Sequence, residues 1–192
     1  MFESAAQVIL ALPYELSLWR IRRSSEYQSG IAWGKPRRGH PEGTIARHIE
    51  ELESRLACTQ QPMSRRQRAR LRLLIHVHDT FKGKARRGAR ILEADSHASL
   101  ARVFLARYCG DRDLLAMVQH HDLPYSIYRR QPAGGATLQE RLKGLATEIR
   151  DWELFSRFLS LDASTAGKDG AWLGPFFKAM RPYAAIPSWL GL

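Results

Sequence analysis

SRRQRARLRLLIHVHDTFK, residues 64–82, decides the fold class of this chain. Leucine and isoleucine repeat behind an arginine-rich front, which is the pattern of a helix with one buried face. Ser64 is a typical N-cap residue, so the pattern predicts a helix from Ser64 to about Phe81. His78 and Asp79 stand side by side within it. The predicted helix therefore carries a histidine and an aspartate in adjacent positions near its end.

Helical patterns extend outward from this stretch in both directions. Residues 44–57 place apolar side chains at helical spacing, and residues 96–108 put Leu100, Val103, Phe104 and Tyr108 on one side. Further helices are expected from Asp111 to the histidine doublet, over 137–150 after Gly134-Gly135, and over 151–161. The proline- and aromatic-rich tail should form short helical pieces over the core. No segment has the alternation of a strand, so the predicted fold is an all-α, single-domain helical bundle.

Composition limits the class of protein. A chain of 192 residues with 44% hydrophobic residues is expected to fold as one domain. No apolar run reaches the roughly 18–20 residues that span a bilayer, and no signal peptide is recognisable, so we expect no membrane partner. Two cysteines make a disulfide framework improbable, and the expected location is the cytoplasm.

Positive charge points to an anionic partner. The net charge is +11, with the excess concentrated in four clusters. These clusters are Arg20-Arg22-Arg23, Lys35-Arg37-Arg38, Ser64–Arg72 and Gly83–Arg90. Such surfaces attract phosphate groups of nucleotides or nucleic acids. The alternative for each cluster is a solvated basic face, but two of the clusters flank His78-Asp79, which favours an anionic substrate.

Histidines mark the candidate site. All seven lie between His40 and His121, and a further candidate carboxylate, Asp162, follows downstream. Imidazole and carboxylate are suitable ligands for divalent transition metals. Clustering in one part of the chain suggests a polynuclear metal centre, with ligands brought inward from several helices.

The order of these residues resembles the HD superfamily of metal-dependent phosphohydrolases, whose signature runs H…HD…H…H…D. The segment HPEGTIARH (40–48) is similar to the opening of HD domains, HDTFK (78–82) to the HD-x-x-K form, and SLDASTAGKDG (160–170) to the segment with the last aspartate. The resemblance covers about residues 40–170. It implies an HD-type domain over 40–170, a helical and basic lead-in over 1–39, and a packed tail over 171–192.

The resemblance also implies a ligand set for two divalent ions. His48, His78, Asp79 and Asp162 would hold the first ion, with Asp79 bridging. His97 and the doublet His120-His121 would hold the second, without a choice between the two histidines of the doublet. The metals remain open among Fe, Mn, Zn, Ni and Co. His40 and His76 have weaker claims, and His76 should face away from the site on its helix.

The implied activity is hydrolysis of a phosphomonoester or phosphodiester, with a nucleotide-like compound as the expected substrate. Asp79 and Lys82 are the candidate catalytic residues, and Lys82, Arg86, Arg87 and Arg90 the candidate substrate-binding residues, with Lys168 a weaker candidate. Asp122 and Asp169 would support ligand histidines or face solvent. Two alternatives stay open: an HD-type di-iron oxygenase, and a basic nucleic-acid-binding or regulatory protein with a structural metal. The oligomeric state is left open.

Overall fold

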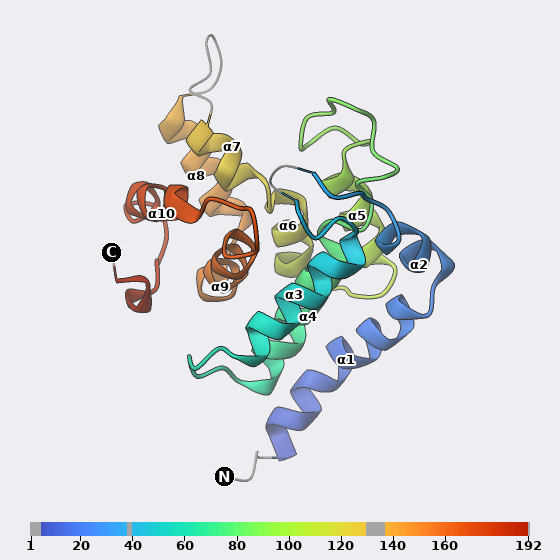
Figure 1. Cartoon of the computed structure of the whole chain (residues 1–192). Coiled ribbons are helices and arrows are strands. Elements are labelled where there is room, and N and C mark those ends of the chain that lie inside the picture. Colours follow the sequence, from blue (N-terminus) through green and yellow to red (C-terminus); the bar gives the residue numbers. More distant parts are fainter. Residues whose placement is uncertain (1–4, 38–39, 130–136, 192) are drawn as a thin grey trace.

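The computed structural model describes residues 5–37, 40–129 and 137–191, so Arg38, Gly134 and Gly135 lie outside the described residues. Regular structure within these ranges is helical, and extended backbone pairs there only in two isolated bridges, Gly34 with Thr44 and Arg37 with His40. The all-α prediction is confirmed (Figure 1). The helices are α1 Ala5–Arg22, α2 Ser25–Ile31, α3 Ile45–Ala57, α4 Arg65–Val77, α5 His97–Ala106, α6 Arg112–His120, α7 Leu123–Arg129, α8 Leu138–Glu148, α9 Trp152–Ala163 and α10 Leu173–Met180.

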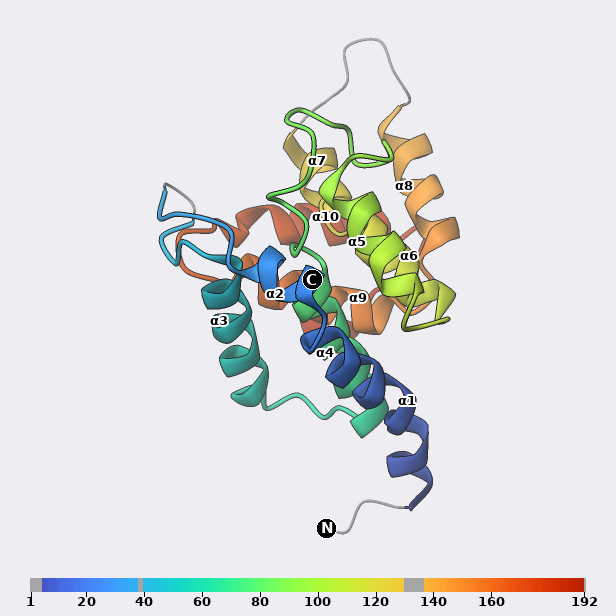
Figure 2. The same cartoon turned by 90° about the vertical axis from the view of Figure 1, so that its right-hand side faces the viewer.

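Helix α4 is the central element. The Ser64 side chain accepts a hydrogen bond from the backbone amide of Gln67, and the Gln67 side chain accepts one from the backbone amide of Ser64. These two hydrogen bonds form a capping box at the start of α4. Helices α1 and α3 flank α4, and α6 and α9 also pack against it (Figures 1 and 2). The central helix therefore fixes the positions of the elements around it.

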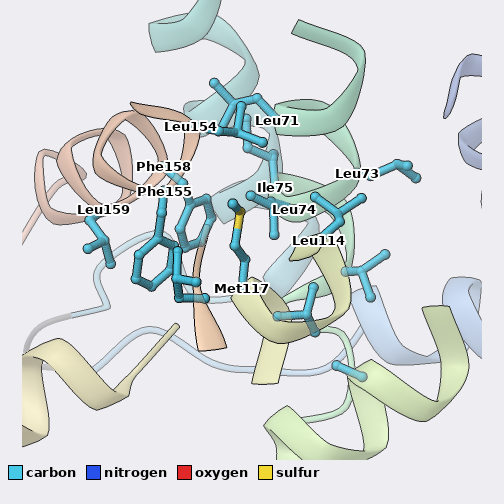
Figure 3. Packing of buried hydrophobic residues seen from close by; sticks show 14 of the residues in the cluster. Leu71, Leu73, Leu74, Ile75, Leu114, Met117, Leu154, Phe155, Phe158 and Leu159 are labelled. Atoms are coloured by element: carbon cyan, nitrogen blue, oxygen red, sulfur yellow. The ribbon is translucent and has the colours of Figure 1, made fainter. Parts of the chain in front are cut away.

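The core lies where α4, α6 and α9 meet. Leu71, Leu74 and Ile75 of α4 are fully buried, as are Met117 of α6 and Phe155 of α9. Figure 3 shows these side chains pointing toward one another from the three helices. Burying a side chain of this size contributes about 1.5–3 kcal/mol. The packing holds the ends of these helices, which carry the candidate ligands, in fixed relative positions.

The helix predicted from Ser64 to Phe81 ends earlier than expected, at Val77. The Thr80 hydroxyl donates to the carbonyl of His76 at 2.7 Å, which is the acceptor that the Thr80 amide would use in an α-helix. That amide donates instead to the Val77 carbonyl at 3.2 Å. A side chain thus replaces the backbone as hydrogen-bond donor, and Asp79 lies in the turns that follow α4.

Most other helix predictions agree with the structure. Thr44, Ser96 and Asp111 cap α3, α5 and α6 through their side chains. The tail forms α10 between the short 3₁₀ turns Gly170–Trp172 and Ser188–Leu190, as expected. The predicted face of α5 was wrong at Val103, which is 65% exposed. In the described ranges, no helix has both the length and the apolar character needed to cross a membrane.

Candidate metal centre

The end of α4 aims one ring nitrogen of His78 at the centre of the bundle. His78 is fully buried, and its Nδ1 lies 3.1 Å from the backbone carbonyls of both Leu74 and Ile75. Nδ1 therefore carries the proton and donates it to the backbone, which leaves Nε2 with a free lone pair. Nε2 is a buried atom without a hydrogen-bond partner. This is the state that a histidine needs to bind a metal.

The first cluster of ligand atoms joins α3, the end of α4 and the last turn of α9. His48 Nε2 lies 3.0 Å from Asp162 Oδ1, and His78 Nε2 lies 3.8 Å from the same oxygen. One ligand atom from each residue falls within 4.8 Å of the others. Two imidazoles and a carboxylate form a donor set that divalent transition metals accept. We call this group the His48 cluster.

The second cluster joins the turn after α4, which carries Asp79, to the start of α5 and the end of α6. Asp79 Oδ1 lies 3.8 Å from His97 Nε2 and 3.4 Å from His121 Nε2, and the two histidine nitrogens are 3.2 Å apart. His121 Nδ1 lies 2.8 Å from the Val118 carbonyl, so the neutral ring carries its lone pair on Nε2. These three residues form a second group that could hold a metal, which we call the His121 cluster.

Asp79 connects the two clusters. Its Oδ2 lies 3.3 Å from His78 Nε2 in the His48 cluster, while Oδ1 faces the His121 cluster. Oδ1 is buried and has no hydrogen-bond partner. Burial opposes ionisation of Asp79, but the nearby His78 and Lys82 hold the pKa of its carboxyl well below the usual range. Asp79 is therefore a buried anion with an open ligand position.

A lysine accompanies each aspartate. Lys82 Nζ lies 2.6 Å from Asp79 Oδ2, and Lys168 Nζ lies 2.6 Å from Asp162 Oδ1. Burial disfavours the charge of Lys82, but Asp79 and Asp122 raise its pKa to about 12. Burial likewise opposes ionisation of Asp162, while Lys168 and His48 lower its pKa well below the usual range. Both lysine side chains are about one-fifth exposed, unlike the fully buried histidines beside them.

Depth divides the site into a floor and a rim. The side chains of His48, His78, Asp79 and His121 are 1–3% exposed and form the floor. The rim consists of the partly exposed His97, Asp162, Lys82, Lys168 and Asp122. The two lysines therefore lie on the part of the site that solvent reaches.

Asp122 belongs to this rim, although the sequence left its role open between supporting a ligand histidine and facing solvent. Its Oδ2 lies 3.2 Å from His97 Nε2, and its Oδ1 lies 3.6 Å from His121 Nε2. Burial opposes its ionisation, but His121 and His97 lower the pKa of the carboxyl below the usual range. With Asp79, it also raises the pKa of His121 against the effect of burial. Its position directly after His121 was the signal in the sequence.

Several predicted site residues lie elsewhere. His120 is buried but belongs to neither cluster, and burial lowers its pKa. His76 faces away as predicted and contacts Tyr27 and Glu53. The three arginines predicted to bind substrate, Arg86, Arg87 and Arg90, are exposed. Arg86 pairs with Asp95 and Glu93, neither of which belongs to a cluster.

The basic run at the start of α4 makes contacts within the protein. Arg70 is buried and pairs with Asp111, Asp113 and Asp151. Arg65 pairs with Glu15, and Arg72 pairs with Glu53. Arg66 donates to the Tyr14 hydroxyl, and Arg68 donates to the Leu56 carbonyl. These cations stabilise the packing of α4 against its neighbours.

Comparison with protein-family models, with curated proteins and with solved structures finds no match to this chain. The functional argument therefore depends on the geometry of the two clusters.

Proposed function

We propose that the protein is a metal-dependent phosphohydrolase of the HD type that cleaves a phosphomonoester or phosphodiester, with a nucleotide-like substrate. The observation that carries the proposal is the connection of the two clusters through Asp79, a buried carboxylate with an unpartnered oxygen. A buried polar atom without a partner costs about 1–3 kcal/mol, which a bound cation would offset. The donor set fits this requirement.

The candidate ligands would form binding sites for two ions. His48, His78 and Asp162 would hold one ion, His97 and His121 would hold the other, and Asp79 would contact both. A pair of divalent ions supplies a nucleophilic water at neutral pH and offsets the charge that develops on a phosphoryl group. The backbone carbonyls that accept from His78 and His121 keep both rings oriented toward this position.

The lysines would bind the substrate. Lys82 and Lys168 each contact a ligand aspartate and lie on the exposed side of the floor. With metal charge neutralising the aspartates, both ammonium groups can turn toward phosphate oxygens that approach from solvent. Two cations beside the clusters favour phosphate chemistry over the oxygenase alternative. The internal pairing of the α4 arginines argues against the nucleic-acid alternative, which needs free cations.

The test combines metal content with turnover. Protein purified without chelator should contain about two divalent ions per chain and hydrolyse bis(p-nitrophenyl) phosphate. Asp79→Asn should retain the fold and lose activity by about 10³-fold or more, since it removes the anion that contacts both ions. Asp169→Asn is the matched control, because asparagine still caps the Gly170–Trp172 turn and the residue is exposed.

Two results would contradict the proposal. Unchanged turnover in the Asp79→Asn protein would exclude a mechanism through this site. Activity that requires iron and consumes oxygen would identify the oxygenase alternative, whereas full activity with manganese under anaerobic conditions supports hydrolysis.

A further inference from the structure

Two neighbouring side chains beside the His48 cluster each have a buried polar atom without a partner. His48 Nδ1 has no hydrogen-bond partner, and neither does Glu42 Oε2. The side chains are 2% and 9% exposed, and Glu42 Oε1 lies 3.8 Å from His48 Nδ1. This distance is slightly too long for a hydrogen bond. An unpartnered ring nitrogen thus adjoins a carboxylate that has one oxygen without a partner.

The loop before α3 brings Glu42 to this place. Gly43 has a φ of +82°, which residues with a side chain rarely adopt. A Cβ at this position would also lie 2.9 Å from Cδ of Pro36. The next residue, Thr44, pairs with Gly34 and caps α3. The turn therefore fixes Glu42 between the chain that precedes it and the helix that carries His48.

His40 contacts the same oxygen of Glu42 that lies nearest to His48. Its Nδ1 lies 3.0 Å from Glu42 Oε1, whereas Oε2 is free of hydrogen bonds. The last torsion of a glutamate side chain is broad, so a small rotation of the carboxylate brings an oxygen within reach of His48 Nδ1 at little cost. His40, a weak candidate as a metal ligand, thereby gains a different role.

Metal binding would require such an acceptor. His48 Nε2 faces Asp162 at 3.0 Å, so a metal in the His48 cluster would use the Nε2 lone pair and leave the proton on Nδ1. His78 and His121 donate their Nδ1 protons to backbone carbonyls, but His48 Nδ1 has no such acceptor. Glu42 supplies the carboxylate that lies nearest to it.

We propose that Glu42 is a positioning residue for the metal centre: it accepts the Nδ1 proton of His48, fixes the Nε2-free tautomer, and is itself held by His40. The inference rests on the proposed metal centre but assigns a function to residues outside the ligand set. Loss of a hydrogen-bond partner behind a metal-bound histidine typically weakens metal affinity about 10–100-fold.

The experiment titrates metal-free protein with Co²⁺ and follows heat and visible absorption. Glu42→Ala should weaken Co²⁺ binding at the His48 cluster about 10–100-fold. Glu42→Gln should weaken it less, because the amide oxygen still accepts the proton but lacks the charge. Glu50→Gln is the matched control, since Glu50 is an exposed residue on the same helix as His48. Circular dichroism checks that each variant is folded.

A second measurement separates positioning from a structural role. In protein loaded with diamagnetic Zn²⁺, nitrogen chemical shifts of the His48 ring should report the Nδ1–H tautomer in the wild-type and Glu42→Gln proteins, and a mixture of tautomers in Glu42→Ala. Equal Co²⁺ affinity and an unchanged tautomer in Glu42→Ala would overturn the inference. If the wild-type protein binds no divalent ion, the metal centre and this inference are both wrong. If it binds metal as expected but cleaves no phosphoester, only the proposed reaction fails.

Discussion

His120 and His121 are neighbours in the chain, yet they have different surroundings. Successive residues of a helix point about 100° apart, so both rings cannot face the same centre from the end of α6. His121 Nδ1 is bound to the Val118 carbonyl and its Nε2 faces Asp79. His120 is buried away from the clusters, with an unpartnered Nδ1. The doublet therefore contains one candidate ligand.

This difference predicts opposite effects of two substitutions. His121→Ala should remove about one of two bound ions, because the His121 cluster loses one of its two histidines. His120→Ala should retain both ions while lowering stability by about 1–3 kcal/mol through loss of a buried side chain. Elemental analysis and urea unfolding measure the two effects separately. Loss of metal from the His120→Ala protein would contradict this assignment.

The sequence could predict ligand types and their order, but only part of their surroundings. Histidines 48, 78, 97 and 121 and both ligand aspartates were candidates before the structure, and the structure brings them together. The choice within the doublet depends on which ring reaches the Val118 carbonyl, which no pattern specifies. Glu42 was missed, because its position depends on a turn at Gly43 and not on helical spacing.

At the level of elements, α2 packs closely against the turn that carries Asp79. A Cβ on Gly30 would lie 2.3 Å from the backbone oxygen of Thr80, so only glycine allows this approach. The lead-in before residue 40 is thus part of the support of the site. Sequence patterns gave no indication of this contact, since a single glycine in a short helix does not identify its neighbour.

Gly30→Ala should therefore destabilise the protein by about 1–3 kcal/mol, since an added methyl in a packed contact forces the backbone to shift. We also expect weaker metal binding, because the displaced turn carries Asp79. Gly144→Ala is the control: it lies on the exposed face of α8 with no atom near the added carbon, and should stabilise by about 0.5–1 kcal/mol. Thermal unfolding and Co²⁺ titration of both variants provide the measurement. Equal stability of the two would show that α2 is free to move.

Helix ends were less predictable than helix interiors. Capping residues such as Ser64 and Thr44 act within one turn, so the sequence could locate the starts of α4 and α3. The end of α4 depends on whether the Thr80 hydroxyl or the Thr80 amide donates to the His76 carbonyl. Thr80 also lies against Gly30, and this tertiary contact influences which group donates. The exposure of Val103 likewise depends on which neighbours cover α5.

For the whole molecule, Arg70 is the charge that connects three helices. Its guanidinium pairs with Asp111 at 2.9 Å and also contacts Asp113 and Asp151. Asp111 and Asp151 are the N-caps of α6 and α9. One side chain of α4 therefore fixes the starting turns of two helices whose opposite ends carry candidate metal ligands.

Arg70→Leu should lower the free energy of unfolding at pH 7 by about 3–5 kcal/mol, because it leaves aspartates without their buried cation. Burial opposes ionisation of Asp111, but the Leu114 amide and Arg70 lower its pKa. Its stabilising contribution is therefore complete above its unfolded value of about 3.9 and is lost as the pH falls through the lower folded value.

Urea unfolding between pH 7 and pH 2 tests this linkage. The wild-type protein should lose stability below about pH 4, and the loss over this range should be smaller in Arg70→Leu. Arg47→Leu, which alters an exposed pair with Glu50, should change stability by less than about 1 kcal/mol and keep the wild-type slope. The same acid slope in Arg70→Leu as in the wild type would contradict the assigned role of Asp111.

The separation of the ligands along the chain has a consequence for the order of folding. His97 and His121 are 24 residues apart on the adjacent helices α5 and α6, whereas His48 and Asp162 are 114 residues apart. Closing the longer loop costs more chain entropy and forms contacts more slowly. During refolding, the residues of the His121 cluster should therefore come together before those of the His48 cluster, and on the ribosome the same order is expected, because α5 and α6 emerge before α9.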